Sequence, residues 1–210
     1  MKIESNIKNI RKKAKDAELI VVTKYQTIDN IKKVYQLGER QFAENKVQDL
    51  IKKREELASD IKWHMIGHLQ KNKVKFIAPF IYMIQSVDSV DLLKRINQYA
   101  NKNQRQINCL IQIKIAQEVS KFGFCIDSAR QLLYSNYLEE YPHVNICGIM
   151  AMATFTNNKE QIKQEFQSLR KIKKLIKQPN SILSIGMSHD YDIAVKSGSN
   201  MIRLGSAIFQ

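Results

Sequence analysis

The sequence has few cysteines and no long apolar run. Its three cysteines are too few and too scattered for a disulfide framework or a zinc cluster. Cys109 and Cys147 lie in apolar, strand-like segments, so we expect both to be reduced core residues of a cytoplasmic protein. No uninterrupted apolar stretch approaches the ~18 residues of a membrane span, and the first residues lack the apolar centre of a signal peptide. We therefore expect no membrane partner.

Acidic residues are scarce relative to basic ones, and the formal net charge is +14. Such a charge can indicate a nucleic-acid partner. The lysines, however, lie mainly on polar faces of predicted helices, as between residues 171 and 177. Aromatic residues do not alternate with them, and there is no zinc-finger or RNP-like motif. We interpret the charge as a solvated, lysine-rich surface and expect no nucleic-acid ligand.

Strand-like and helix-like segments alternate along the chain. Apolar residues at helical spacing predict a helix over residues 2–16. Thr27 is expected to cap the next helix, which should stop at Gly38. Asp88, with Asp91 three residues later, is expected to open another. The predicted strands are residues 18–24, 40–44, 62–67, 81–86, 107–114, 144–150, 181–185 and 201–204.

About eight strand–helix units in succession indicate an α/β protein with a parallel sheet. The sequence predicts a single (β/α)8 barrel of the TIM type over residues 1–210, with an additional N-terminal helix. A doubly wound open sheet is the alternative. A length of 210 residues is close to the lower limit of about 200 for a barrel, so the loops should be tight. No internal repeat or linker is visible, and the three prolines fall between predicted elements.

Polar residues follow the predicted strands, and in a barrel the C-terminal strand ends form one face. These strand-end residues are Lys24, Glu44, Asn45, His64 to His68, Ser86, Lys114, Met150, Ser188 and Arg203 to Ser206. Phosphate sites in barrels commonly follow strands 7 and 8, where the small-residue turns 184–188 and 205–206 fall. A lysine amine facing such turns suits pyridoxal phosphate (PLP), which needs a primary amine and fixed N–H and O–H donors.

Each of these residues also has a purely structural interpretation. Lys24 could be a solvated lysine at a strand end, and Gly205 could serve only a tight turn. Arg203 is harder to explain, because a strand covered on both faces disfavours an unpaired charge; a carboxylate or a ligand should satisfy it. His64 and His68 have the spacing of a helical metal pair, but they fall on a strand and its turn. We therefore expect no metal there.

Several segments resemble, in order and spacing, the motifs of the pyridoxal phosphate homeostasis proteins. They are residues 22–24, 42–49, 63–73, 120–123, 148–150, 183–190 and 203–209. The resemblance extends from about Ile20 to the last residue. It implies a cytoplasmic, usually monomeric, PLP-binding barrel that is similar to the barrel domain of alanine racemase.

The resemblance also implies roles for individual residues. The cofactor-binding residues would be Lys24, Asn45, Ser188, Arg203, Gly205 and Ser206. Lys24 would hold PLP as an internal aldimine, and Arg203 would keep the pyridine nitrogen unprotonated, which makes the ring a weaker electron sink. The two serines and the glycine would hold the phosphate, and the asparagine would line the ring pocket. Ser206 stands where the family usually has threonine, so the hydroxyl is retained.

The expected function is binding of PLP rather than catalysis. Racemisation on PLP needs acid–base groups on both faces of the substrate's α-carbon. In the related racemases one of these groups comes from a second domain of a partner subunit, and we expect no such domain here. The resemblance thus implies a carrier in intracellular vitamin B6 homeostasis, with apo PLP-dependent enzymes or B6-recycling enzymes as candidate partners. An amino-acid racemase-like PLP enzyme is the alternative, and a basic module that binds RNA or partner enzymes is a third class.

Overall fold

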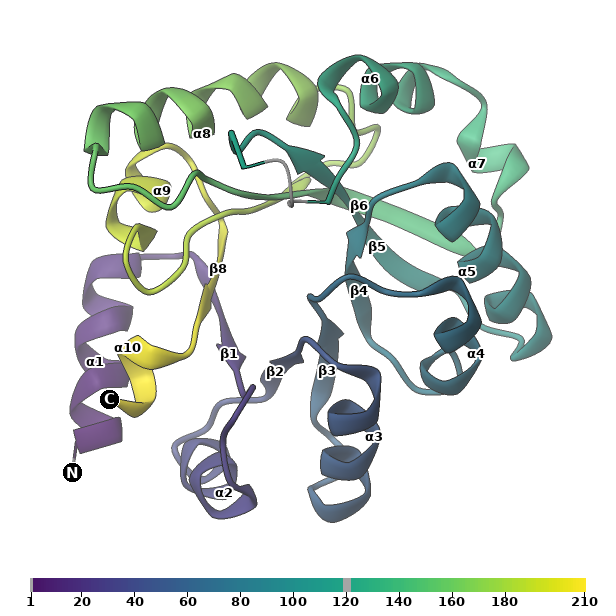
Figure 1. The fold of residues 1–210 in the computed structure, drawn as a ribbon. Coiled ribbons are helices and arrows are strands. Elements are labelled where there is room, and N and C mark those ends of the chain that lie inside the picture. Colours follow the sequence, from purple (N-terminus) through teal and green to yellow (C-terminus); the bar gives the residue numbers. More distant parts are fainter. Residues whose placement is uncertain (1, 119–121) are drawn as a thin grey trace.

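The computed structural model describes residues 2–118 and 122–210, and the strands of this part form a closed parallel barrel in the order β1 to β8 (Figure 1). The strands are β1 (Glu18–Val22), β2 (Gln41–Glu44), β3 (Lys62–Met65), β4 (Met83–Val87), β5 (Ile107–Lys114), β6 (Val144–Met152), β7 (Ile182–Ser184) and β8 (Met201–Leu204). The predicted TIM-type barrel is therefore confirmed, and the open-sheet alternative is wrong. The motif at residues 120–123 lies partly outside the described residues, which omit Ser120 and Lys121.

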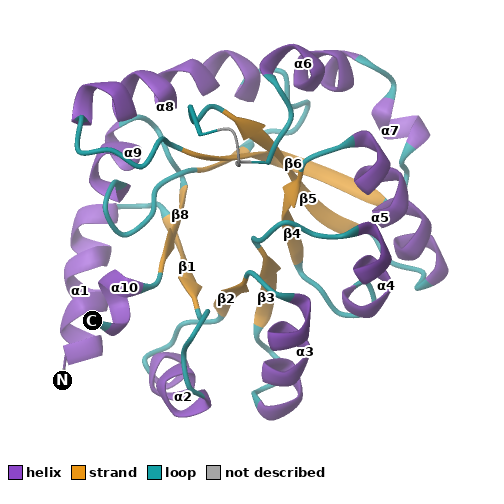
Figure 2. Cartoon of the chain, in the orientation of Figure 1, coloured by secondary structure: helices purple, strands orange, loops and turns teal. Residues whose placement is uncertain are grey.

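Helices surround the barrel on its outer face (Figure 2). They are α1 (Lys2–Ala14), α2 (Ile28–Gln36), α3 (Val47–Glu56), α4 (Val74–Ile77), α5 (Val90–Lys102), α6 (Ile126–Tyr134), α7 (Tyr137–Glu140), α8 (Lys159–Lys173), α9 (Tyr191–Lys196) and α10 (Ser206–Phe209). A short 3-10 helix, η1 (Lys71–Lys73), precedes α4. Within the described part of the chain, no helix has the length and apolar content needed to cross a bilayer.

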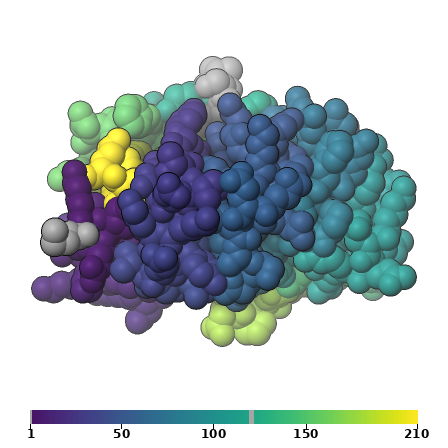
Figure 3. Space-filling view, turned by 90° about the horizontal axis from the view of Figure 1, so that it is seen from below, coloured from purple at the N-terminus to yellow at the C-terminus, as the bar shows by residue number. Residues whose placement is uncertain are grey.

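The two ends of the chain lie side by side. The additional N-terminal helix α1 packs against α10, and Asn6 Nδ2 donates a hydrogen bond of 3.0 Å to the carbonyl of Ile208. Figure 3 shows the yellow C-terminal residues against the purple N-terminal ones. Strand β1 also pairs with β8, which closes the barrel. Gly205 and Ser206, which follow β8 and are predicted to bind phosphate, thus lie between a strand paired with β1 and a helix packed against α1.

Side chains alternate between the barrel interior and the layer under the helices. In β1, Ile20 and Val22 belong to an inner apolar cluster, whereas Leu19 and Val21 pack in the larger core between strands and helices. Because both faces of the strand are covered, the apolar run is continuous, as parallel barrels require. Of the two cysteines predicted for the core, Cys109 is buried but Cys147 is only partly buried.

The helix boundaries follow the predicted signals with one exception. Thr27 Oγ1 accepts the Asn30 backbone N–H at 3.3 Å at the start of α2, and Gly38 follows its end with a φ of 96°. The assignment of Asp88 as a cap is wrong, because Ser89 Oγ accepts the Leu92 backbone N–H in the first turn of α5. The Asp88 carboxylate instead accepts a hydrogen bond from a histidine on another loop.

Candidate functional site

The C-terminal ends of the strands surround a cavity of about 770 Å³. Its lining includes every residue predicted to bind the cofactor: Lys24, Asn45, Ser188, Arg203, Gly205 and Ser206. They reach the cavity from the loops after β1, β2 and β7, from β8 and the loop after it, and from the start of α10. The volume lies within the range of about 300–1,000 Å³ that is typical of small-molecule sites. The barrel therefore brings the two ends of the sequence together around one ligand-sized space.

The turn that carries Lys24 is anchored to a buried carboxylate. Strand β1 ends at Val22, earlier than predicted, so Lys24 lies in the turn that follows it. Thr23 Oγ1 donates a hydrogen bond of 2.6 Å to Glu44 Oε1, and Lys53 Nζ donates one of 2.7 Å to the Thr23 carbonyl. Lys53 also forms an ion pair with Glu44. Lys24 itself is exposed, and none of the described residues pairs with its Nζ, so its amine is accessible.

Arg203 is a buried cation at the wall of the cavity. Its side chain is 4% exposed. Nη1 donates to the carbonyl and to the hydroxyl of Ser184, both at 2.7 Å, and Nη2 donates to the carbonyl of Ala151 at 3.1 Å. Among the described residues, neutral oxygens rather than a carboxylate accept these hydrogen bonds, and contact of the guanidinium with a ligand stays a prediction. Burial lowers the pKa of Arg203 to about 10, and the charge of Asp190 opposes this shift. The guanidinium remains protonated at neutral pH, and its Nε has no partner among the described residues.

The turn after β7 presents Ser188 to the cavity. Gly186 has a φ of 101°, and a Cβ there would lie 2.7 Å from the Cβ of a helix α9 alanine, so glycine is required. Asp190 Oδ1 accepts the backbone N–H of Met187 at 2.6 Å and closes the turn. Burial raises the pKa of Asp190, partly offset by this hydrogen bond. Ser188 Oγ accepts the Ala207 N–H at 3.2 Å, which joins this turn to the start of α10.

Two glycines at the cavity wall allow close approaches of backbone segments. A Cβ at Gly205 would lie 3.2 Å from the Val22 carbonyl oxygen, and a Cβ at Gly67 would lie 2.1 Å from the Asn45 carbonyl oxygen. The second distance excludes any side chain at Gly67 without movement of the backbone. The loop after β3 is thereby packed against Asn45 in the loop after β2, and the loop after β8 is packed against the end of β1.

Aromatic side chains line the mouth of the cavity, and the sequence reasoning missed them. Tyr25 is 85%, Phe122 is 52% and Phe155 is 80% exposed, yet all line the cavity. His68 stacks on Phe122 with ring centroids 3.8 Å apart, and its Nδ1 lies 2.8 Å from Asp88 Oδ2. Their position in the sequence could have indicated them, because these rings lie in loops that follow strands, and the C-terminal strand ends form the site.

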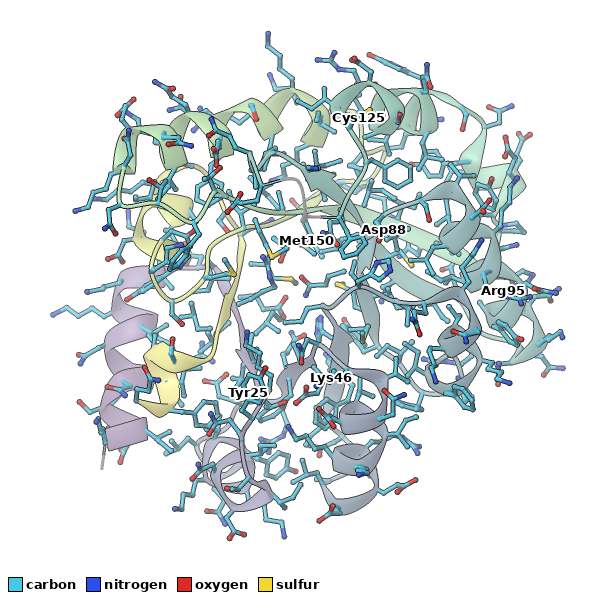
Figure 4. The ribbon with its side chains drawn as sticks, viewed as in Figure 1. Tyr25, Lys46, Asp88, Arg95, Cys125 and Met150 are labelled. Carbon is cyan, nitrogen blue, oxygen red and sulfur yellow. The ribbon has the colours of Figure 1, made fainter. Side chains whose placement is uncertain are left out.

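Other predicted strand-end residues lie elsewhere. Met150 is buried inside the ring of strands, as Figure 4 shows, because β6 continues to Met152, and Met152 lines the cavity instead. Glu44 and Ser86 are buried. His64 is also buried, in hydrogen bonds to two glutamines, whereas the next histidine reaches the mouth of the cavity.

Buried His64 should make stability sensitive to acid. Burial, and more weakly the charge of Lys62, lowers its pKa to about 3, below the value of 6.5 for an unfolded histidine. Between these values the unfolded chain binds the extra proton, so the free energy of unfolding falls as the pH falls. From about pH 6.5 to about pH 4.5 we expect a loss of about 2 kcal/mol from this group, measured by urea unfolding.

A matched pair of variants tests whether His64 causes this pH dependence. His64→Gln should remove that part of the pH dependence, whereas His143→Gln, at a partly exposed site, should retain it. Equal pH profiles in the wild type and in both variants would show that His64 titrates normally in the folded protein.

The comparisons with known proteins agree with this architecture. The alanine racemase N-terminal domain family matches residues 1–210. The pyridoxal phosphate homeostasis protein of Haemophilus influenzae is 34% identical over 216 residues, covering 99% of this chain and 90% of that protein. PipY of Synechococcus elongatus PCC7942, solved with PLP bound, is 30% identical with a TM-score of 0.89, covering 99% of this chain and 100% of that one.

Alanine racemase of Bartonella henselae, solved with covalently bound pyridoxal phosphate, has a TM-score of 0.78. It is 14% identical, and the alignment covers 99% of this chain and 58% of the racemase. At that identity the likeness shows the fold alone. The full-length matches at 30% identity or more carry the assignment: the chain belongs to the family of pyridoxal phosphate homeostasis proteins, on the barrel of the alanine racemase N-terminal domain.

Proposed function

We propose that this protein binds PLP in the cavity, attached reversibly to Lys24, and serves PLP homeostasis in the cytoplasm with little or no catalysis of its own. The observation that carries the proposal is the placement of an accessible lysine amine and a buried arginine in one ligand-sized cavity. The names of the full-length relatives and the PLP bound to PipY support the same cofactor.

The residues present fit PLP at each of its functional groups. PLP supplies an aldehyde that condenses with a primary amine, and an electron-withdrawing ring. Lys24 Nζ is an amine without a competing ion pair among the described residues. The unpartnered Nε–H of Arg203 is a donor for the pyridine nitrogen, which is an acceptor when unprotonated. The hydroxyls of Ser188 and Ser206, with the backbone of Gly205, supply donors for the phosphate.

The same residues favour storage and release over catalysis. A permanently cationic partner such as Arg203 opposes protonation of the pyridine nitrogen, and the ring then withdraws electrons less strongly. The Lys24 amine is exposed, so a competing amine can reach it from solvent. We propose a monomer that passes PLP to apo PLP-dependent enzymes or receives it from B6-recycling enzymes.

The test is trapping of PLP on the wild-type protein. We expect a new absorbance band when PLP is added, which borohydride reduction makes permanent, and peptide mass mapping should place the label on the peptide that contains Lys24. No band, or a label spread over many lysines, would contradict the proposed site. Steady turnover of an amino acid by the loaded protein would instead support the racemase-like alternative.

A further inference from the structure

A line of buried polar side chains runs from Arg203 through the barrel interior. Arg203 Nη1 lies 2.7 Å from Ser184 Oγ, and Ser184 Oγ lies 2.7 Å from Gln85 Oε1. Gln85 Nε2 lies 3.0 Å from His64 Nδ1, and His64 Nε2 lies 2.7 Å from Gln41 Oε1. We call these five residues the interior network. It begins at the cavity and ends at the first residue of β2, at the opposite end of the barrel.

The interior network has a single donor direction. A guanidinium can only donate, so the Ser184 hydroxyl accepts from Arg203 and must donate onward to Gln85 Oε1. This fixes the Gln85 amide with its NH2 group toward His64 Nδ1, which must then be an acceptor. The His64 proton therefore lies on Nε2, where it is donated to Gln41 Oε1. The low pKa of His64, a consequence of its burial, keeps the imidazole neutral as this pattern requires.

The interior network consists of polar side chains whose burial costs free energy of folding. Ser184, Gln85 and His64 are fully buried, and a buried polar group destabilises the fold unless it is hydrogen-bonded. Gln85 also lies where the pairing between β4 and β5 shifts register, between Ile84 and Val87. Such irregularities re-aim a side chain and often adjoin functional sites. A barrel interior filled with apolar side chains would need neither feature.

We propose that Ser184, Gln85 and His64 are positioning residues that fix the guanidinium of Arg203 for the pyridine end of the cofactor. This inference rests on the proposed function. The three bonds of Nη1 and Nη2 go to interior oxygens, and they leave the Nε–H and one Nη2 N–H of this cavity-lining residue without a partner among the described residues. Rotation of the guanidinium would remove the donor to the Ser184 hydroxyl and to the carbonyls of Ser184 and Ala151, and an unsatisfied buried group is unfavourable. The network therefore holds one orientation of Arg203 in place before the ligand arrives.

The test compares two buried serines. Ser184→Ala removes a member of the network, whereas Ser86→Ala removes an equally buried hydroxyl that has no hydrogen-bond partner among the described residues. Gln85→Met breaks the network with little change in shape, and Ser184→Thr restores the hydroxyl. Circular dichroism and thermal unfolding establish that each variant is folded. If Ser184→Ala does not fold, Gln85→Met alone tests the proposal.

The first readout is the ¹⁵N NMR signal of His64, which lies outside the described lining of the cavity. In the ligand-free wild type we expect a neutral ring protonated on Nε2. Addition of PLP should shift the ring nitrogens of the wild type, Ser86→Ala and Ser184→Thr, but not of Ser184→Ala or Gln85→Met. A purely local role of these residues in stability would not transmit this shift.

The second readout is the bound cofactor itself. We expect the two network-breaking variants to bind PLP about tenfold more weakly, the scale of one lost hydrogen bond to a charged group. Their bound-PLP absorbance should also change with pH between 6 and 9, because a displaced Arg203 no longer keeps the pyridine nitrogen unprotonated, whereas Ser86→Ala should match the wild type.

The outcomes separate the two proposals. If Ser184→Ala and Gln85→Met match Ser86→Ala in both readouts, the backbone carbonyls alone orient Arg203 and the positioning proposal is overturned. If the wild type takes up no PLP on Lys24, the proposed function itself fails, whatever the network variants do.

Discussion

Lys24→Ala should abolish covalent uptake of PLP. Lys24 is the lysine predicted to bind the cofactor, and its amine is exposed in a turn held by buried Glu44. Without that amine the described lining of the cavity offers the cofactor aldehyde no other lysine, and only the proposed, weaker contacts with Arg203 and the small-residue turns remain. The measurement is the borohydride-trapped fraction, followed by the intact mass of the protein. We expect no trapped label at a PLP concentration that saturates the wild type.

Lys46→Ala is the matched control for this variant. Lys46 is exposed at the start of α3, where Figure 4 labels it, in the loop that also carries cavity-lining Asn45. This variant should trap PLP as the wild type does. Both variants should unfold within about 0.5 kcal/mol of the wild type, since each replaces an exposed side chain. Undiminished trapping in Lys24→Ala, with the label on another lysine, would refute the assignment.

Lys53→Met should cause a large loss of stability. Glu44 is fully buried, and Lys53 is its ion-pair partner and a donor to the Thr23 carbonyl. Removing one member of a buried ion pair leaves an uncompensated charge, which typically costs about 3–5 kcal/mol. We expect a decrease of this size in the free energy of unfolding, measured with urea. Uptake of PLP should weaken as well, because the turn that carries Lys24 loses its anchor.

Two further variants test the mechanism of this loss. Lys52→Met changes an exposed lysine on the same helix and should stay within about 0.5 kcal/mol of the wild type. Adding Glu44→Gln to Lys53→Met removes the stranded charge and should recover part of the stability. Equal stability of Lys53→Met and Lys52→Met would mean that the ion pair contributes nothing.

The barrel could be predicted because its signals are local and repeated. Apolar runs such as that of β1 are buried on both faces, and their alternation with amphipathic helices leaves few architectures open. Convergence of the strand ends then predicted which residues share one face. The errors are also local: β1 stops at Val22, and Ser89 rather than Asp88 caps α5. Asp88 and Ser89 are both good caps in isolation, and only the distant His68 distinguishes them.

The sequence by itself determined the succession of strands and helices, the family and the six predicted cofactor residues of the cavity lining, but not the aromatic residues at its mouth. Only the tertiary structure decided what those residues contact: neutral oxygens at Arg203, the Glu44 ion pair beneath Lys24, and the interior network that reaches His64. The physical reason is range. Periodicity and turn chemistry act over a few neighbouring residues, whereas a buried polar side chain must find its partner across the closed barrel. That partner depends on strand register, which follows from the packing of the whole chain.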